Sequence, residues 1–180
     1  MRDANFKSRI SAHLKTLRQQ SGLSLDAAAK LTGVSKAMLG QIEREESSPT
    51  IATLWKISSG LNTSFSAFLS SEERHQREEK AFPDDPNMQV KVLFPFQADV
   101  AFEMFEITLR NHHKQMSTPH ATGVIEHVQV TQGSVNVFFD NQWHKLLAGE
   151  GVRFFSDQVH GYQALSDTAV FHNIVSYPPK

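Results

Sequence analysis

The stretch GVSKAMLGQIERE, from Gly33 to Glu45, predicts a short helix that Ser35 caps and that Leu39 and Ile42 anchor to a core. Gly40 lies in the middle of this helix. Glycine at such a position costs about 1 kcal/mol relative to alanine, because it loses more backbone freedom on folding. The presence of Gly40 therefore needs a reason other than helix formation.

The helix face opposite Leu39 and Ile42 carries small, amide and cationic residues, namely Lys36, Ala37, Gly40, Gln41 and Arg44. A face without bulky side chains can enter the major groove of DNA closely. There Gln41 can pair with a base edge, and the two cations can reach guanine edges or phosphates. The alternative is that Gly40 lets a neighbouring helix pack closely.

The residues before this helix complete a helix-turn-helix pattern. The segment LSLDAAAKLTG has Ser24 as a predicted N-cap and ends at Gly33, so two short helices are joined by a tight turn. Ser24 and the backbone N–H groups that follow it are suited to hold a phosphate. Four basic residues of the preceding segment are further candidates for phosphate contacts: Lys7, Arg9, Lys15 and Arg18.

Charge is distributed unevenly along the 180 residues, although the net charge is only -1. Residues 1–70 hold nine basic and five acidic residues, a balance of +4, whereas residues 71–88 and 89–180 have balances of -3 and -2. A positive N-terminal part is what polyanion binding requires. The chain has no cysteine, no apolar run long enough to span a membrane and no signal-peptide core, so we expect a cytoplasmic protein without disulfides.

The hydrophobic period changes along the chain, which predicts an α + β multidomain protein. Residues 1–70 show helical periodicity in five short segments, and residues 71–88 form a charged stretch that we interpret as a linker. Residues 89–180 instead alternate with a period of two, with turn signals between short runs rich in Val, Ile and Phe. This pattern predicts an all-β sandwich or small barrel.

The N-terminal part resembles the DNA-binding domain of the Xre/Cro–C1 repressor family over residues 7 to about 69. The run SLDAAAKLTGVSKAMLGQIEREESSPTIATLWKISSGLN carries this resemblance. It implies that the DNA-binding residues are Ser24, Ser35, Lys36, Ala37, Gly40, Gln41 and Arg44. One position departs from the family pattern, because Leu25 stands where many members have a phosphate-binding glutamine.

The C-terminal part resembles the cupin superfamily, a double-stranded β-helix. The stretches PHATGVIEHVQVTQG and GEGVRFFSDQVHGY carry this resemblance, with His120, Glu126 and His160 at motif positions. Thr122 replaces the second motif histidine. Two imidazoles and a carboxylate suit Zn, Fe, Mn or Ni, so the resemblance implies one divalent metal held by these three residues. The alternative is that the two histidines line a ligand pocket without a metal.

Three residues are candidates for binding an effector. Thr122 shares strand parity with His120 and Glu126 and is therefore expected to face the interior. Arg110 and Arg153 lie among apolar strand residues, and arginine binds carboxylates with two hydrogen bonds. The alternative for each arginine is an exposed side chain whose apolar stem lies along the surface.

The whole chain resembles bacterial regulators of sulfur-compound use, on the runs ESSPTIATLWKI, STPH, GVIEHV and GEGVRF. This implies a non-enzymatic transcriptional regulator that binds a DNA operator as a homodimer and senses a small effector, such as a sulfur-containing amino acid or related metabolite. Two alternatives remain at this point: a metal-dependent cupin enzyme with an accessory DNA-binding domain, and a regulator whose cupin domain only dimerises it.

Overall fold

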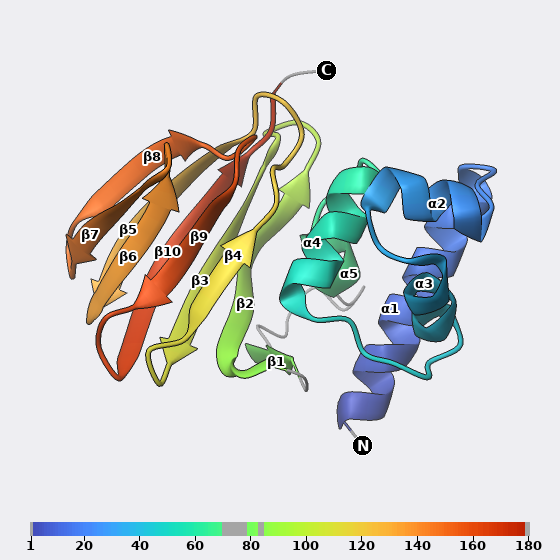
Figure 1. The fold of residues 1–180 in the computed structure, drawn as a ribbon, viewed down its shortest axis with the longest axis horizontal. Helices are drawn as coiled ribbons and strands as arrows, with labels where there is room; N and C mark the ends of the chain where they lie inside the picture. Colours follow the sequence, from blue (N-terminus) through green and yellow to red (C-terminus); the bar gives the residue numbers. More distant parts are fainter. Residues whose placement is uncertain (1, 70–78, 83–84, 179–180) are drawn as a thin grey trace. The chain divides into compact units, whose positions relative to one another are not determined.

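The computed structural model describes residues 2–69, 79–82 and 85–178, and the chain divides into a helical unit, Met1–Leu69, and a β unit, Ser70–Lys180. Figure 1 shows the helices and the strands as separate groups along the chain. Within the described ranges, no helix is long and apolar enough to cross a membrane.

The helical unit contains the five helices that the periodicity predicts. They are α1 (Arg2–Gln20), α2 (Leu25–Thr32), α3 (Lys36–Glu43), α4 (Ile51–Gly60) and α5 (Ser66–Leu69). Each of the longer helices turns its apolar stripe inward, so that Leu14, Leu39, Ile42 and Leu54 are almost fully buried in one core.

Three polar N-caps and one glycine fix where the middle helices begin and end. The side-chain oxygens of Ser24, Ser35 and Thr50 accept hydrogen bonds from the backbone N–H groups of Ala27, Met38 and Thr53. Gly33 ends α2 with a φ of 66°, a left-handed conformation that glycine adopts without strain. The caps predicted at Ser24 and Ser35 and the end predicted at Gly33 are confirmed.

A partly buried ion pair ties α1 to α3. The Arg18 guanidinium donates to both carboxylate oxygens of Glu43 at 2.6 and 2.9 Å, and also to the carbonyl oxygen of Leu23. The two side chains are only 15% and 7% exposed. The suggestion that Arg18 contacts phosphate is therefore wrong for this structure, because its guanidinium is used inside the protein to orient α3.

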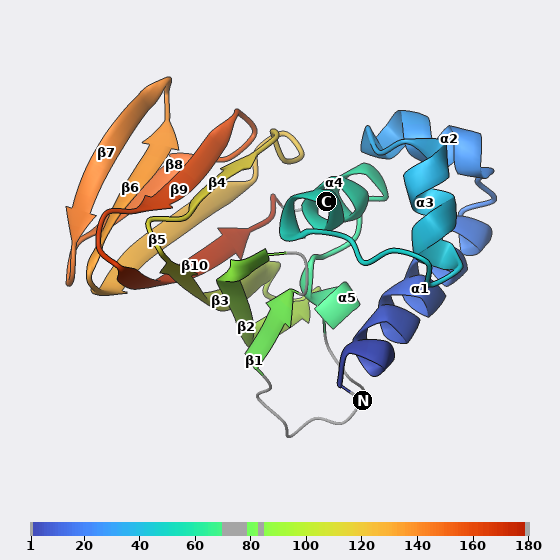
Figure 2. The same cartoon turned by 60° about the horizontal axis from the view of Figure 1, so that its bottom comes forward.

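The β unit consists of two antiparallel sheets. One sheet has six strands in the order β1 (Glu79–Phe82), β2 (Asp85–Gln97), β3 (Phe102–Arg110), β10 (Thr168–Ser176), β5 (Ile125–Gln132) and β8 (Gly151–Phe155). The other has four strands in the order β4 (Lys114–Ser117), β9 (His160–Ala164), β6 (Ser134–Phe139) and β7 (Gln142–Leu147). Figure 2 shows the smaller sheet facing the larger one, and the inner faces form the core of this unit.

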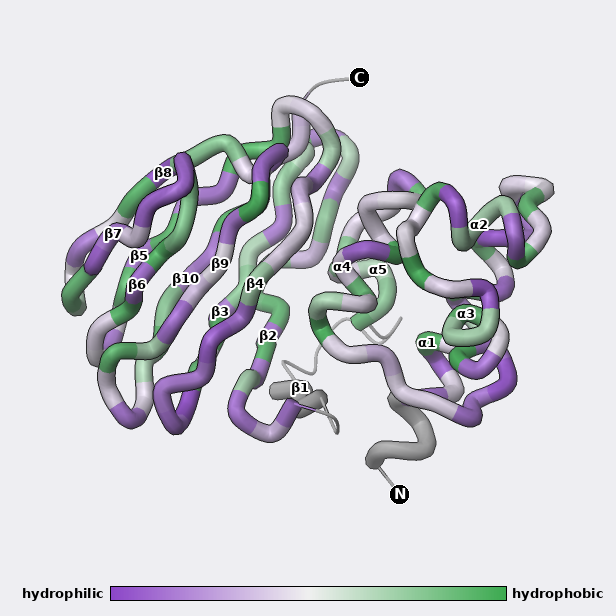
Figure 3. Tube along the Cα trace, in the orientation of Figure 1, coloured by the Kyte–Doolittle hydropathy of each residue, from purple (hydrophilic) through white to green (hydrophobic). Residues whose placement is uncertain are grey.

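Residues alternate between core and outer face along the strands. In β3 every second residue is buried, from Glu103 to Leu109, and in β10 the buried residues run from Ala169 to Val175. Figure 3 shows hydrophobic and hydrophilic colours changing repeatedly along the strand traces. The prediction of an all-β C-terminal part is confirmed.

Tight turns join consecutive strands of the β unit. Phe139 pairs with Gln142, which leaves Asp140 and Asn141 as a two-residue hairpin loop with φ values of 51° and 60°. Two successive positive φ values are typical of a type I′ turn. Gly133, between β5 and β6, has a φ of 73°.

Part of the predicted linker, 71–88, is in fact strand. β1 occupies residues 79–82 and the start of β2 occupies residues 85–88, and β1 pairs with Asp85 and with residues 89–91 of β2. Residues 70–78 and 83–84, which also belong to the predicted linker, lie outside the described residues. Charges and two prolines hid these strands from a pattern-based interpretation, as short length and polar composition hid β4, β7 and β9.

Candidate functional site

The outward face of α3 is the first candidate site. Lys36, Ala37, Gln41 and Arg44 are exposed, as the helix-turn-helix interpretation requires. Both cations have carboxylate partners within the helical unit. Lys36 Nζ lies 2.9 Å from Asp26 Oδ2, and Arg44 donates to both oxygens of Glu46 at 2.7 and 2.8 Å.

Gly40 differs from this expectation because it is buried. A Cβ built on it would lie 3.0 Å from Nη1 of Arg44 and 3.8 Å from Cδ1 of Leu25. Both neighbours are ends of flexible side chains, so no helix backbone requires glycine at this position. The alternative that Gly40 permits close helix packing is therefore not supported, and the Arg44 side chain covers Gly40.

Gly60, at the end of α4, shows what a packing glycine looks like. A Cβ there would lie 2.5 Å from Cα of Thr32 and 2.6 Å from the carbonyl oxygen of Leu31. These are backbone atoms of α2, which cannot move away cheaply. Close helix packing in this unit thus depends on Gly60.

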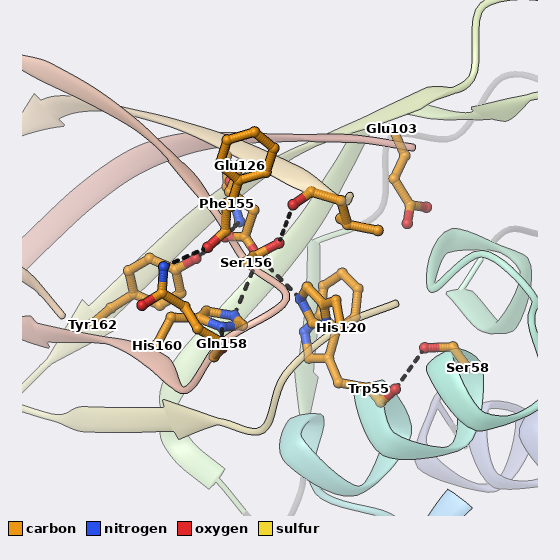
Figure 4. A network of polar contacts seen from close by, with 12 residues as sticks. Trp55, Ser58, Glu103, His120, Glu126, Phe155, Ser156, Gln158, His160 and Tyr162 are labelled. Atoms are coloured by element: carbon orange, nitrogen blue, oxygen red, sulfur yellow. Dashed lines mark hydrogen bonds and ion pairs between the residues drawn. The ribbon is translucent and has the colours of Figure 1, made fainter. Parts of the chain in front are cut away.

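The second candidate site is a buried cluster of His120, Glu126 and His160 in the β unit. The Nε2 atoms of the two histidines lie 3.0 and 3.2 Å from Oε1 of Glu126. The three side chains are 5%, 1% and 1% exposed. Figure 4 shows the cluster with Tyr162 beside it.

Loops and strands from distant parts of the chain position this cluster. Glu126 lies on β5 and His160 on β9, so they come from different sheets. His120 precedes β5, and its backbone N–H donates to the carbonyl oxygen of Ser156 at 2.9 Å. The ring of His160 is fixed by a 2.8 Å contact between Nδ1 and the carbonyl oxygen of Gln158.

Hydrogen-bond chemistry determines the protonation of His160. A carbonyl oxygen only accepts, so Nδ1 carries a hydrogen and donates it to Gln158. Nε2 faces a carboxylate oxygen, which also only accepts. Without another cation, both ring nitrogens of His160 face acceptors, which favours the imidazolium; with a metal in the cluster, Nε2 would instead offer its lone pair.

The electrostatics of the cluster agree with this assignment. Burial alone would raise the pKa of the Glu126 carboxyl, but the charge of His160 and hydrogen bonds from both histidines hold that pKa well below its usual value. Burial lowers the pKa of His160, yet the Glu126 charge outweighs it, and the net pKa shift of His160 is upward.

The other oxygen of Glu126 is bound by two residues that sequence reasoning missed. The Tyr162 hydroxyl and Nδ2 of Asn173 both donate to Oε2, the latter at 2.9 Å. Asn173 Nδ2 also lies 3.3 Å from the Tyr162 oxygen. Burial and the Glu126 charge raise the pKa of Tyr162 well above its usual value, so its hydroxyl stays protonated.

The turn that follows His120 is held by Asp157, which lies between β8 and β9. Oδ2 of Asp157 accepts a hydrogen bond from the backbone N–H of Gly123 at 2.9 Å. Thr122 lies in this turn and is exposed. The expectation that Thr122 faces the interior is wrong, because strand alternation does not apply within a turn.

The two candidate arginines also lie away from the interior. Arg153 is exposed and precedes the buried Phe154 on β8, while Arg110 is half-buried and follows the buried Leu109 on β3. Alternation along each strand places both on the outer face of the six-stranded sheet. Both arginines are therefore better described as surface residues than as pocket residues.

The buried cluster fits a divalent metal by its donor set. One ligand atom from each of His120, Glu126 and His160 can be chosen so that all lie within 4.8 Å of one another. Two imidazole nitrogens and a carboxylate oxygen suit Zn, Fe, Mn or Ni. The bond from His160 to a backbone carbonyl is typical of metal-binding histidines.

Comparisons with known proteins match both units. A family model described as a helix-turn-helix matches residues 14–68, and one described as an AraC-like ligand binding domain matches residues 102–180. The HTH-type transcriptional regulator SutR of Escherichia coli (strain K12) is 47% identical over 180 residues, covering 97% of this chain and 98% of the relative.

Two solved structures extend the similarity to three dimensions. The crystal structure of an HTH_3 family transcriptional regulator from Vibrio cholerae has a TM-score of 0.93 and 62% identity, over 98% of this chain and 99% of that chain. The cupin domain of an XRE family transcriptional regulator from Enterobacter cloacae has a TM-score of 0.50 and 40% identity, over 51% of this chain and 98% of that chain.

These relatives decide between a regulator and an enzyme. A full-length relative is a transcriptional regulator, so the prediction of a regulator rather than an enzyme is confirmed, and the cupin-enzyme alternative is set aside. The chain belongs to the family of transcriptional regulators that join an Xre-type helix-turn-helix DNA-binding domain to a cupin-type ligand-binding domain.

Proposed function

We propose that this regulator reads its operator with the exposed face of α3 and senses a small effector at the buried cluster of the β unit. The observation that carries the proposal is that one chain has both an exposed α3 face with Lys36 and Arg44 and a buried His–Glu–His cluster. We further propose that residues 1–70 act as the DNA-binding part and residues 89–180 as the sensor.

On the DNA side, the direct contacts would come from Lys36, Ala37, Gln41 and Arg44. Gln41 would pair with a base edge, while the two cations would exchange their carboxylate partners for phosphates or guanine edges. Ser24 and Ser35 use their oxygens as helix caps, so their hydroxyl hydrogens would donate to phosphate oxygens. Gly40 would become accessible once Arg44 turns toward the DNA.

Two substitutions on α3 test the proposal that this helix binds the operator. Gln41→Ala should weaken specific binding by about 1–3 kcal/mol and leave non-specific binding nearly unchanged. Gly40→Leu should block close approach to the groove. Normal operator binding by a folded Gly40→Leu protein, measured by fluorescence anisotropy on fragments recovered from bound genomic DNA, would refute the role of Gly40.

On the sensor side, His120, Glu126 and His160 would hold one divalent metal, and the effector would bind beside it. We propose a sulfur-containing amino acid or related metabolite, on the resemblance to regulators of sulfur-compound use. Because Arg110 and Arg153 lie on the outer face, a preference for an anionic group would depend on the metal alone. The effector must favour one state of the protein over another to change DNA binding.

Calorimetry on the full chain tests the sensor side, using sulfur-containing amino acids with and without added Zn²⁺ or Mn²⁺. Binding should require His120 and His160, so the double substitution to alanine should abolish the effector response and keep operator binding. An absence of heat with every sulfur-containing amino acid would refute the ligand class. A persistent response in the double variant would refute the location.

We also propose that the regulator acts as a homodimer on two half-sites about one helical turn apart. One helix-turn-helix unit buries little DNA surface, and the β unit is the better candidate for the dimer contact because β7 and β8 are edge strands. A monomer by analytical ultracentrifugation at micromolar concentration, with and without operator, would contradict this.

A further inference from the structure

We propose that Tyr162 and Asn173 are positioning residues that commit Glu126 to bind through Oε1 alone, so that the cluster keeps room for the effector. This inference rests on the proposed sensor function of the same cluster. It concerns how the carboxylate is held, which the three cluster residues do not explain by themselves.

The two oxygens of Glu126 have entirely different surroundings. Oε1 faces Nε2 of His120 and of His160 at 3.0 and 3.2 Å. Oε2 faces two donors, the Tyr162 hydroxyl and Nδ2 of Asn173. A carboxylate with both partners on Oε2 cannot rotate without leaving buried donors unpaired, which makes the orientation costly to change.

The identity of each group at Oε2 follows from the same chemistry. A carboxylate only accepts hydrogen bonds, so the Asn173 amide must present its NH₂ group, and the Tyr162 hydroxyl must donate. The Tyr162 oxygen lies 3.3 Å from the same amide nitrogen, on the side that faces Oε2, so the two oxygens share one N–H of Asn173. The pair therefore forms one closed arrangement around Oε2, with Tyr162 on β9 and Asn173 on β10, one strand from each sheet.

The consequence is a limit on the number of donors the protein can offer. With Oε2 committed to Tyr162 and Asn173, Glu126 offers one oxygen, and the cluster offers three donor atoms in total. Three protein donors leave at least one coordination position of a divalent metal for water or ligand. A carboxylate free to bind with both oxygens would compete with the effector for that position.

The chain offers a matched control, because its only other tyrosine also donates to a buried carboxylate of the β unit. The Tyr177 hydroxyl bonds to Oε1 of Glu103, whose side chain is fully buried. Tyr177→Phe therefore removes a similar hydrogen bond from a carboxylate outside the cluster. A general loss of packing or stability would affect both variants alike.

The first experiment compares Mn²⁺ and Zn²⁺ affinity, by calorimetry on the full chain, among wild type, Tyr162→Phe and Tyr177→Phe. We expect Tyr162→Phe to bind about 10- to 100-fold more weakly, as for other losses of a partner of a metal ligand, and Tyr177→Phe to bind as wild type does. Should Tyr162→Phe fail to fold, Asn173→Leu removes the other donor. Equal affinity in wild type and the variant would overturn the inference.

The second experiment separates this inference from the metal hypothesis. In metal-free protein, the ¹⁵N signals of the His120 and His160 rings report their contact with Oε1. These signals should move in Tyr162→Phe and stay in place in Tyr177→Phe. If wild type binds neither metal, the metal part of the proposed function fails, while unmoved ring signals would still overturn the role of Tyr162.

Discussion

The α3 face and the β-unit cluster both pair basic groups with carboxylates, but they do so in opposite environments. The carboxylate and cation side chains on the helical side, in the pairs Lys36–Asp26 and Arg44–Glu46, are between 52% and 64% exposed. The cluster around Glu126 is 1–5% exposed. Exposed ion pairs contribute little to stability, whereas breaking a buried pair leaves a charge that water cannot solvate.

This difference separates two kinds of function. Water and salt already weaken the exposed pairs, so an external polyanion can replace the carboxylates at small cost. The buried cluster holds its members together strongly, so only a ligand that supplies a comparable charge can enter it. Substitutions of Lys36 and Arg44 should therefore change DNA binding with little change in stability, and substitutions in the cluster should change both effector binding and stability.

The largest expected effect is that of Glu126→Gln in metal-free protein. Removing the charge takes the counter-ion from His160, which must then release its proton, and takes the ionised acceptor from Tyr162 and Asn173, so we expect a loss of about 3 kcal/mol in the free energy of unfolding. Urea denaturation followed by circular dichroism measures this. The control is Glu106→Gln, because Glu106 is one-third exposed on the outer face beside Lys91. Equal losses of unfolding free energy in Glu126→Gln and Glu106→Gln would contradict the expectation that buried charge pairs matter more than exposed ones.

Arg18→Met tests the same contrast within the helical unit. Glu43, whose side chain is only 7% exposed, would lose its bidentate partner, which we expect to cost about 2 kcal/mol in the free energy of unfolding. The matched control is Lys36→Met, which removes a cation from an exposed pair and should leave stability unchanged within error. Helical circular dichroism during urea denaturation measures both. If Lys36→Met lost as much stability as Arg18→Met, the exposed and the less exposed ion pair would not differ as we expect.

The two helical glycines should respond to alanine with opposite signs. Gly60→Ala forces a methyl group against the backbone of α2 and should cost about 1–3 kcal/mol. Gly40→Ala meets only flexible side-chain ends and should stabilise the helical unit by up to about 1 kcal/mol. We expect the stabilised Gly40→Ala protein to bind operator more weakly. Unchanged operator affinity would show that Gly40 is not needed for groove approach.

The smallest expected effect is a pH dependence that arises from His13 on α1. Its ring lies edge-on to Phe68, with centroids 4.7 Å apart, and its buried Nε2 has no hydrogen-bond partner among the described residues. Burial lowers the pKa of His13 below its ordinary value of 6.5. The unfolded chain therefore binds the His13 proton more readily than the folded chain does. The stability that the neutral ring contributes is fully present above the ordinary pKa and is lost as pH falls through the lower pKa of the folded state.

The measurement compares wild type with His13→Gln by urea denaturation at about pH 7.5 and about pH 5.5. The other histidines are the same in both proteins, so the difference between the two pH dependences isolates His13. Wild type should lose more stability on acidification than His13→Gln. An identical loss in both proteins would exclude a role for His13.

Local features of the fold were predictable from sequence because their causes are local. Ser24 and Ser35 as caps, Gly33 as a helix end and the turn at Asp140 each depend on a few neighbouring residues. The prediction that His120, Glu126 and His160 lie together came from the resemblance to a known motif and not from their spacing. The unassigned strands β1, β4, β7 and β9 are short or polar, and alternation over so few residues carries little information.

Other features depend on contacts between distant residues. Tyr162 and Asn173 lie 36 and 47 positions after Glu126 along the chain, and nothing near either residue marks it as a partner. The burial of Gly40 depends on the conformation of Arg44, which helix periodicity does not specify. The positions of Arg110 and Arg153 were predictable, because each adjoins a buried strand residue and must face the other way.

The carboxylates beside Lys36 and Arg44 also affect the ion balance of operator binding. A free cation that neutralises a phosphate releases about 0.9 counterions from B-DNA. When Lys36 leaves Asp26, or Arg44 leaves Glu46, the vacated carboxylate attracts cations from solution and offsets part of that release. Operator affinity should therefore fall less steeply with salt than the number of phosphate contacts implies, so the regulator would keep more of its operator affinity as ionic strength rises.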